Sequence, residues 1–339
     1  MQCNLAQRSL HQFVTSLADD PLRILFCGSD RFSIASLDAL VHAKHTVPGL
    51  IDEIHVAHRP AKPTGRGLKT LKEVPIRAAA SALSLPTHTL DTFTGWTPPT
   101  SYSLIIAVSF GLLVPPRILN LARHGGLNVH PSLLPDLRGS APIEHAVLQQ
   151  RSFTGVSVQT LHPRRFDEGV VLAQTRAPGL AIGEDETADA LKERLAQMGA
   201  QMLVDVLVER RYVEPLQSAE WYTGATAYAP KITKQDRFVN FEIMDMARVL
   251  AVQRALGDMW CLLPNGERLV VHAIVPLNTA TLTTGVGQAV MWYDEARKEL
   301  LFRAACGRVA TIKSSTYPGG KAGKGNAKVE KILKEQSKT

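Results

Sequence analysis

Residues 126–147 read GLNVHPSLLPDLRGSAPIEHAV and decide the fold class. The segment Gly126–His130 has the composition of a short strand, and Pro142–Gln149 has the pattern of a helix. Three prolines and one glycine lie in residues 131–142, which predicts a stiff loop between them. A strand followed by a loop and a helix is the repeating unit of α/β proteins.

The same alternation continues on both sides of this stretch. Further strands are expected at Arg23–Gly28, Glu53–His58, Ser103–Gly111 and Gly155–Leu161. Further helices are expected at Ser33–Ala43 (with Ser33 as N-cap), Ile76–Leu83 and Thr187–Glu209. The alternation predicts a Rossmann-like α/β domain in which a parallel sheet has helices on both faces.

The length of 339 residues favours two domains. The α/β domain is expected to cover residues 21–212, followed by an irregular linker at 213–235. Short strand patterns around a Pro-Asn-Gly turn predict a small β-barrel-like domain at 236–316. Residues 317–339 are rich in Gly and Lys and are expected to be a mobile basic tail.

Charge is concentrated at the end of the chain. Residues 301–339 hold nine Lys or Arg and two acids, a balance of +7 that equals the net charge of the whole chain. This pattern is typical of proteins that bind a polyanion, and a solvated tail is the alternative. No stretch approaches the about 18 apolar residues of a membrane span, so no membrane partner is expected.

The first twenty residues have no acid before Asp19 and place Leu10, Phe13, Val14 and Leu17 at helical spacing. This resembles a mitochondrial targeting segment at 1–20, and an ordinary N-terminal helix is the alternative. The four cysteines lie far apart and favour a reducing compartment.

Several chemistries lack their motifs. The turn after the first strand reads CGSDRF, without the G-x-G-x-x-G that dinucleotide binding needs, and no Walker A sequence is present. No G-x-S-x-G surrounds a serine, which argues against a serine nucleophile. The pair His55 and His58 has no third ligand at an obvious spacing, so no metal is expected.

The stretch Arg59–Lys72 holds five basic residues together with two prolines and two glycines. Proline and glycine disfavour a regular helix, so a flexible basic loop is predicted. Such a loop on an α/β domain suits phosphate contacts, and a solvated loop is the alternative.

Asn128 and His130 are two residues apart on the predicted strand, so both side chains point to one face. At the carboxyl end of a parallel strand they would lie where α/β sheets carry their sites. An amide can donate to a developing oxyanion, and an imidazole can transfer a proton. Asp167, beyond the next strand, could orient the imidazole, although such an Asn-x-His pair alone is more often structural.

The continuation NVHPSLLPDLRG resembles the signature of the formyltetrahydrofolate-dependent formyltransferases. The segments RPAKPTGRGLK, VSFGLLVPPRIL and YAPKITKQDRF are similar to the branch of that family that acts on tRNA. The resemblance implies a catalytic trio, a folate-contacting loop and a basic loop at the tRNA acceptor end. These positions are Asn128, His130 and Asp167; Ser132, Leu133, Leu134 and Pro135; and Arg59, Lys62, Arg66 and Lys69.

The implied enzyme is a monomer in the mitochondrial matrix with an OB-like C-terminal domain. It would transfer the formyl group of 10-formyltetrahydrofolate to the amine of initiator methionyl-tRNA. The amine would attack directly, with Asn128 and His130 stabilising the oxyanion. No metal would be needed. The segment HPRRFDEG departs from the family pattern by one residue, which makes Glu168 a rival to Asp167. The alternatives are a formyltransferase for glycinamide ribonucleotide or an amino-sugar nucleotide, and a non-catalytic RNA-binding protein.

Overall fold

A computed structural model describes residues 21–64, 67, 69–277 and 290–336. The expected targeting segment at 1–20 and the predicted tRNA contact Arg66 lie outside the described residues. The chain divides into two compact units, with the change from the first to the second after Pro230. Two short segments, Ile143–Ser152 and Ile182–Asp189, also cluster with the second unit.

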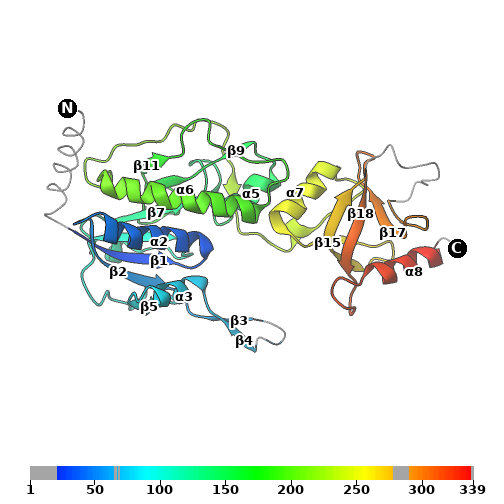
Figure 1. The fold of residues 1–339 in the computed structure, drawn as a ribbon, viewed down its shortest axis with the longest axis horizontal. Coiled ribbons are helices and arrows are strands. Elements are labelled where there is room, and N and C mark those ends of the chain that lie inside the picture. The colour runs from blue at the N-terminus through cyan, green and yellow to red at the C-terminus, as the bar shows by residue number, and fades with distance from the viewer. Residues whose placement is uncertain (1–20, 65–66, 68, 278–289, 337–339) are drawn as a thin grey trace. The chain divides into compact units, whose positions relative to one another are not determined.

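The first unit is built on a seven-stranded sheet in the order β11-β10-β7-β6-β1-β2-β5 (Figure 1). Its strands are β1 Leu22–Gly28, β2 Ile51–His58, β5 Thr87–Thr89, β6 Leu104–Val108, β7 Gly126–His130, β10 Ser157–Thr160 and β11 Val171–Gln174. Six of these strands run in the same direction, and β10 runs antiparallel to its two neighbours, β7 and β11. The predicted parallel sheet therefore holds for most of the strands and is wrong at β10. The short β10–β11 connection contains no helix, and a connection without a crossover joins antiparallel neighbours.

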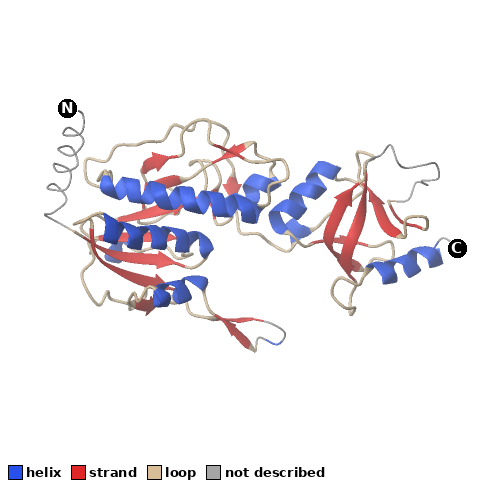
Figure 2. Cartoon of the chain, in the orientation of Figure 1, coloured by secondary structure: helices blue, strands red, loops and turns tan. Residues whose placement is uncertain are grey.

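The helices are α2 Arg31–Thr46, α3 Pro75–Ala82, α4 Pro116–Leu119, α5 Pro142–Leu148 and α6 Ala188–Val208. Helices α2 and α6 lie across one face of the sheet (Figure 2). Helix α6 approaches the sheet closely at Gly199. A Cβ at this position would lie 2.7 Å from Val129 of β7 and 3.7 Å from Phe32 of α2. The opposite face packs against a buried cluster drawn from residues 90–122. The N-cap of α2 is Asp30 rather than Ser33, because its side chain accepts from the Ser33 N–H.

Several two-stranded ladders complete the first unit. They are β3 Lys62–Thr64 with β4 Thr70–Lys72, β8 Arg138–Gly139 with β13 Tyr228–Ala229, and β9 Phe153–Thr154 with β12 Leu180–Ala181. The basic segment predicted as a flexible loop thus carries a short antiparallel hairpin. Figure 1 shows this hairpin projecting away from α3 and β5.

The second unit contains an antiparallel sheet in the order β14-β15-β18-β17-β16. Its elements are η2 Gln235–Arg237, α7 Met246–Leu256, β14 Met259–Leu262, β15 Arg268–Pro276, β16 Met291–Asp294, β17 Glu299–Arg303, β18 Val309–Thr316 and α8 Asn326–Gln336. The predicted hairpin around Pro264-Asn265-Gly266 is confirmed, with Gly266 at a φ of 78°. Five antiparallel strands of this length are compatible with the predicted small barrel.

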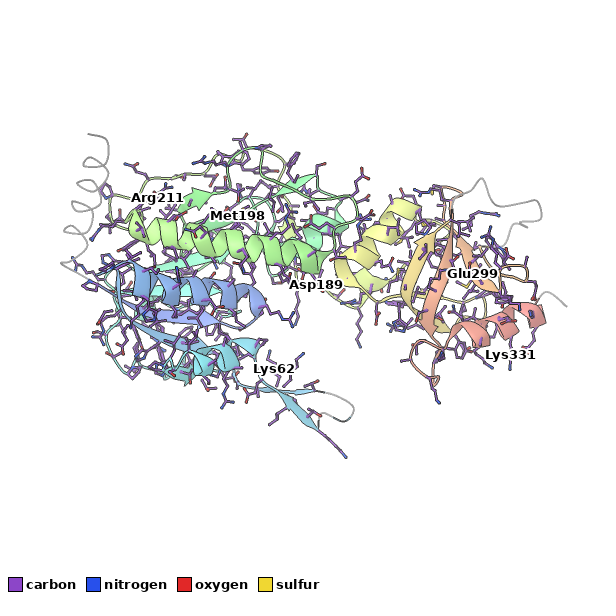
Figure 3. The ribbon with its side chains drawn as sticks, in the orientation of Figure 1. Lys62, Asp189, Met198, Arg211, Glu299 and Lys331 are labelled. Atoms are coloured by element: carbon purple, nitrogen blue, oxygen red, sulfur yellow. The ribbon has the colours of Figure 1, made fainter. Side chains whose placement is uncertain are left out.

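The predicted mobile tail is instead partly helical. Helix α8 packs against β18, since the Asn326 side chain donates to the Ile312 carbonyl at 2.6 Å and Val329 is fully buried. Its apolar residues hold the helix on the sheet, while Lys331 is exposed (Figure 3). None of the helices in the described part of the chain has the length and apolar character needed to span a bilayer.

Candidate active site

Asn128 and His130 stand at the carboxyl end of β7, between β6 and β10. Asn128 is in register with Ala107 of β6 on one side and Gln159 of β10 on the other. Val129 between them faces α6, so the two polar side chains point to the opposite face of the sheet. The backbone of three strands therefore determines where these side chains lie.

The His130 ring is buried and has a protein partner on each nitrogen. Nδ1 lies 3.3 Å from Asp167 Oδ1, and Nε2 lies 3.0 Å from the Leu137 carbonyl oxygen. A carbonyl only accepts, so Nε2 carries a hydrogen. A hydrogen on Nδ1 would face the Asp167 carboxylate, which can accept it.

Asp167 reaches His130 from the loop between β10 and β11. Its backbone has a φ of 55°, a left-handed conformation that costs about 1–3 kcal/mol for a residue with a side chain. The loop returns so closely to β10 that a Cβ at Gly169 would lie 1.7 Å from the Thr160 carbonyl oxygen, so only glycine fits there. Asp167 Oδ2 accepts from the Gly139 N–H at 2.9 Å, and this contact orients the carboxylate.

Glu168 faces elsewhere, although it is the next residue. Its carboxylate lies 2.9 Å from Arg165, and a third of its side chain is exposed. The hydrogen bond from Arg165 lowers the pKa of the Glu168 carboxyl. Of the two adjacent acids, Asp167 is the one that contacts His130.

The amide of Asn128 is held at both ends. Its Nδ2 donates to the Ala107 carbonyl at 2.9 Å, and its Oδ1 accepts from Gln159 Nε2 at 3.1 Å. Gln159 is buried and is not among the predicted site residues. A glutamine inside the buried strand pattern GVSVQTL could have marked it as a candidate site residue. The register that places it beside Asn128, however, depends on strand pairing.

The predicted folate-contacting residues form the loop after β7. The side chains of Ser132, Leu133 and Leu134 are buried, while Pro135 is half-buried. The Ser132 hydroxyl donates to the Asp136 carbonyl at 2.6 Å, and Gln174 Nε2 donates to the Leu134 carbonyl at 2.8 Å. The loop backbone is held as well, because Leu134 N–H donates to Ser157 Oγ at 3.1 Å and the Ser157 hydroxyl donates to the Ser132 carbonyl at 2.8 Å. These contacts give the loop a defined shape.

Part of the expected linker is built into this site. Leu137 N–H donates to the Ala227 carbonyl, and Asp136 Oδ1 accepts from the Ala227 N–H, both at 2.8 Å. Gly139 has a φ of 122°, and a Cβ there would lie 2.4 Å from the Ala229 carbonyl oxygen. Residues 227–229 therefore support the loop whose Gly139 binds Asp167.

The basic hairpin presents lysines to solvent. Lys62 and Lys69 are exposed, and Lys62 stands directly opposite Lys72 in the β3–β4 ladder (Figure 3 labels Lys62). Like charges opposite one another are destabilising and favour an anionic partner. Arg59 differs from the lysines, because it pairs with Asp91 at 2.8 Å and its side chain is 20% exposed.

The two histidines of the H-x-x-H pair have separate partners. His55 Nε2 lies 2.6 Å from Glu53 and its Nδ1 lies 2.9 Å from His88, while His58 Nδ1 contacts the Arg59 carbonyl. Among the described residues no group of three or more His, Cys, Asp or Glu is placed to hold a metal ion.

An imidazole, a carboxylate and an oriented amide meet at the carboxyl end of β7. Such a group of side chains suits transfer of a carbonyl group to a nucleophile. Comparisons with known proteins agree with this chemistry. Residues 22–207 match the formyl transferase family. The mitochondrial methionyl-tRNA formyltransferase of Saccharomyces cerevisiae is 33% identical over 329 residues, covering 83% of this chain and 82% of the yeast protein. The human mitochondrial methionyl-tRNA formyltransferase is 33% identical over 243 residues, covering 70% of this chain and 58% of the human protein. The chain belongs to the formyl transferase family, and the yeast and human relatives are both named methionyl-tRNA formyltransferase.

Solved structures share the fold at lower identity. An N-formyltransferase from Helicobacter canadensis, in complex with folinic acid and dTDP-3-aminofucose, superimposes with a TM-score of 0.56 at 13% identity. That match covers 86% of this chain and 98% of the other. HypX from Aquifex aeolicus, in complex with tetrahydrofolic acid, gives 0.53 at 17% identity, covering 87% of this chain and 44% of HypX.

Proposed function

We propose that this chain transfers the formyl group of 10-formyltetrahydrofolate to the α-amine of initiator methionyl-tRNA, which makes formylmethionyl-tRNA for translation initiation. The observation that carries the proposal is the His130–Asp167 contact beside the oriented amide of Asn128. Yeast and human relatives named for this activity support the choice of acceptor.

The proposed reaction is a direct transfer. The α-amine attacks the formyl carbon, and negative charge develops on the formyl oxygen. Asn128 donates to that oxygen with the Nδ2 hydrogen that does not bind Ala107, and His130 donates with Nε2–H. In this step the substrate replaces the Leu137 carbonyl as the acceptor for His130.

Collapse of the tetrahedral intermediate then breaks the bond between the formyl carbon and N10. N10 takes a proton from His130, and the proton lost by the attacking amine restores the imidazolium. Asp167 holds the ring in place and stabilises its positive charge. The backbone of the Ser132–Pro135 loop shapes the folate site, and no covalent enzyme intermediate forms.

The proposed acceptor can be tested directly. The protein would be incubated with 10-formyltetrahydrofolate and either charged initiator methionyl-tRNA, glycinamide ribonucleotide or a dTDP-linked amino sugar, and tetrahydrofolate release would be followed. Release with methionyl-tRNA alone is the expected result. Release only with a small amine would contradict the proposal, and no release with any acceptor would favour a non-catalytic RNA-binding protein.

We propose that the basic hairpin, an OB-like C-terminal domain and the Lys-rich helix α8 contact the tRNA backbone. The Lys62→Ala substitution is expected to weaken tRNA binding and to reduce the slope of log K against log salt by about 1, as loss of one phosphate contact does. Binding would be measured by filter retention over a series of KCl concentrations.

Lys44 provides a matched control for Lys62. It lies at the end of α2 that points away from the carboxyl edge of the sheet, and it donates to the Asp52 carbonyl. Lys44→Ala is expected to leave the slope unchanged. Equal slopes for wild type and Lys62→Ala would exclude a phosphate contact at Lys62.

We also propose that the enzyme acts as a monomer in the mitochondrial matrix. The mitochondrial yeast and human relatives and the amphipathic, acid-poor start of the sequence support the location. Residues 1–20 fused to a fluorescent protein would be imported into mitochondria, and a cytosolic signal would contradict this.

A further inference from the structure

We propose that Gln159 is a positioning residue that orients Asn128 and Asp167 together for formyl transfer. The inference rests on the catalytic roles proposed above for those two side chains. Gln159 is 1% exposed and stands on β10 directly across from Asn128. A buried glutamine that contacts two reacting groups is placed to control both at once.

The orientation of the Gln159 amide follows from its partners. Its Oε1 lies 3.0 Å from the Gly169 N–H. A backbone N–H only donates, so the oxygen must face Gly169 and the nitrogen must face the site. Nε2 then lies 3.1 Å from Asn128 Oδ1 and 3.4 Å from Asp167 Oδ1. One amide nitrogen has two hydrogens and can donate to both.

This arrangement determines which way the Asn128 amide points. Because Oδ1 accepts from Gln159, Nδ2 must face the Ala107 carbonyl on the neighbouring strand. One Nδ2 hydrogen binds Ala107, and the other is left for the formyl oxygen. If Gln159 could not donate, only the Ala107 carbonyl would hold the Asn128 amide, and the second Nδ2 hydrogen would be less firmly aimed at the formyl oxygen.

Gln159 also holds the loop that carries Asp167. Its Oε1 binds the backbone two residues after Asp167, and its Nε2 lies near the carboxylate itself. The left-handed backbone of Asp167 needs such support from its surroundings. A register irregularity between Val158 and Gln159 in the pairing with β11 marks a local bulge, a device that re-aims a side chain beside a site.

The test compares Gln159→Leu with wild type in steady-state formylation. Gln159→Leu replaces the amide with an apolar side chain of similar size that can neither donate nor accept. We expect kcat to fall about 10–100-fold, as loss of a supporting contact does, with KM for both substrates little changed. In the Asn128→Ala background the same substitution should lower kcat much less, because the Asn128 amide that Gln159 orients is absent.

Gln174→Leu is the matched control. Gln174 is the buried glutamine of the neighbouring strand β11, and it bonds Leu134 and Ser157 rather than the catalytic trio. Gln174→Leu should lower kcat by the same factor in the wild-type and Asn128→Ala backgrounds. If Gln159→Leu also lowers kcat by the same factor in both backgrounds, the proposal is overturned.

A second variant keeps the test valid if Gln159→Leu does not fold. Gln159→Glu has the same shape, but its ionised carboxylate cannot donate to Asn128 or Asp167. The ratio of its kcat to that of wild type should rise toward low pH, as the new carboxyl takes up a proton and regains a donor. A ratio that does not change with pH would contradict the positioning role.

The failure of this inference can be told apart from the failure of the proposed function. If wild type itself formylates no methionyl-tRNA, the proposed function fails. If wild type is active and both variants match it, the role of Gln159 fails.

Discussion

The Asp167→Asn variant is expected to lose about 10²–10⁴-fold in kcat for formylation, the range for removal of a group that supports proton transfer. The carboxylate lies 3.3 Å from His130 Nδ1, and in the proposed mechanism its charge stabilises the imidazolium that protonates N10. Asparagine has the same shape and still accepts from the Gly139 N–H, so the loop should keep its conformation. Formylation of saturating methionyl-tRNA under initial-rate conditions measures the loss.

The adjacent acid provides the control. Glu168→Gln removes a carboxylate of the same loop that pairs with Arg165 and does not reach His130. This variant is expected to keep kcat close to that of wild type. Near-full activity in Asp167→Asn together with a large loss in Glu168→Gln would show that the catalytic acid is Glu168.

Asn128→Ala is expected to reduce kcat about 10²–10³-fold, the usual cost of one oxyanion donor. The oxyanion exists only in the transition state and the intermediate, so affinity for methionyl-tRNA should change little. Single-turnover formylation and filter binding on the same preparation separate the two effects.

Asn120→Ala is the matched control, because Asn120 is an exposed asparagine at the end of α4. It is expected to match wild type in both assays. If Asn128→Ala weakens tRNA binding as much as it slows transfer, Asn128 acts in binding rather than on the oxyanion.

The sequence predicted the central strand and the faces of its side chains well. Strand β7 has the predicted bounds, Gly126–His130, because its short alternating pattern is closed by a proline. The antiparallel course of β10 was missed, since a strand pattern does not say which way the strand runs in a sheet. Helix α8 was not predicted, because the glycines before it and the many lysines within it are typical of an unstructured tail. Only Val329 and Ile332, which are buried, indicate a helix that packs on a sheet.

By itself the sequence determined that Asn128 and His130 share one face of a buried strand, since alternation along a strand is a local property of the backbone. It also placed two acids, Asp167 and Glu168, on the segment that follows the next strand. Only the tertiary structure decided between them, because the close return of Gly169 to β10 and the Gly139 N–H direct one carboxylate to His130. The role proposed for Gln159 likewise depends on contacts between strands that lie 31 residues apart in the chain.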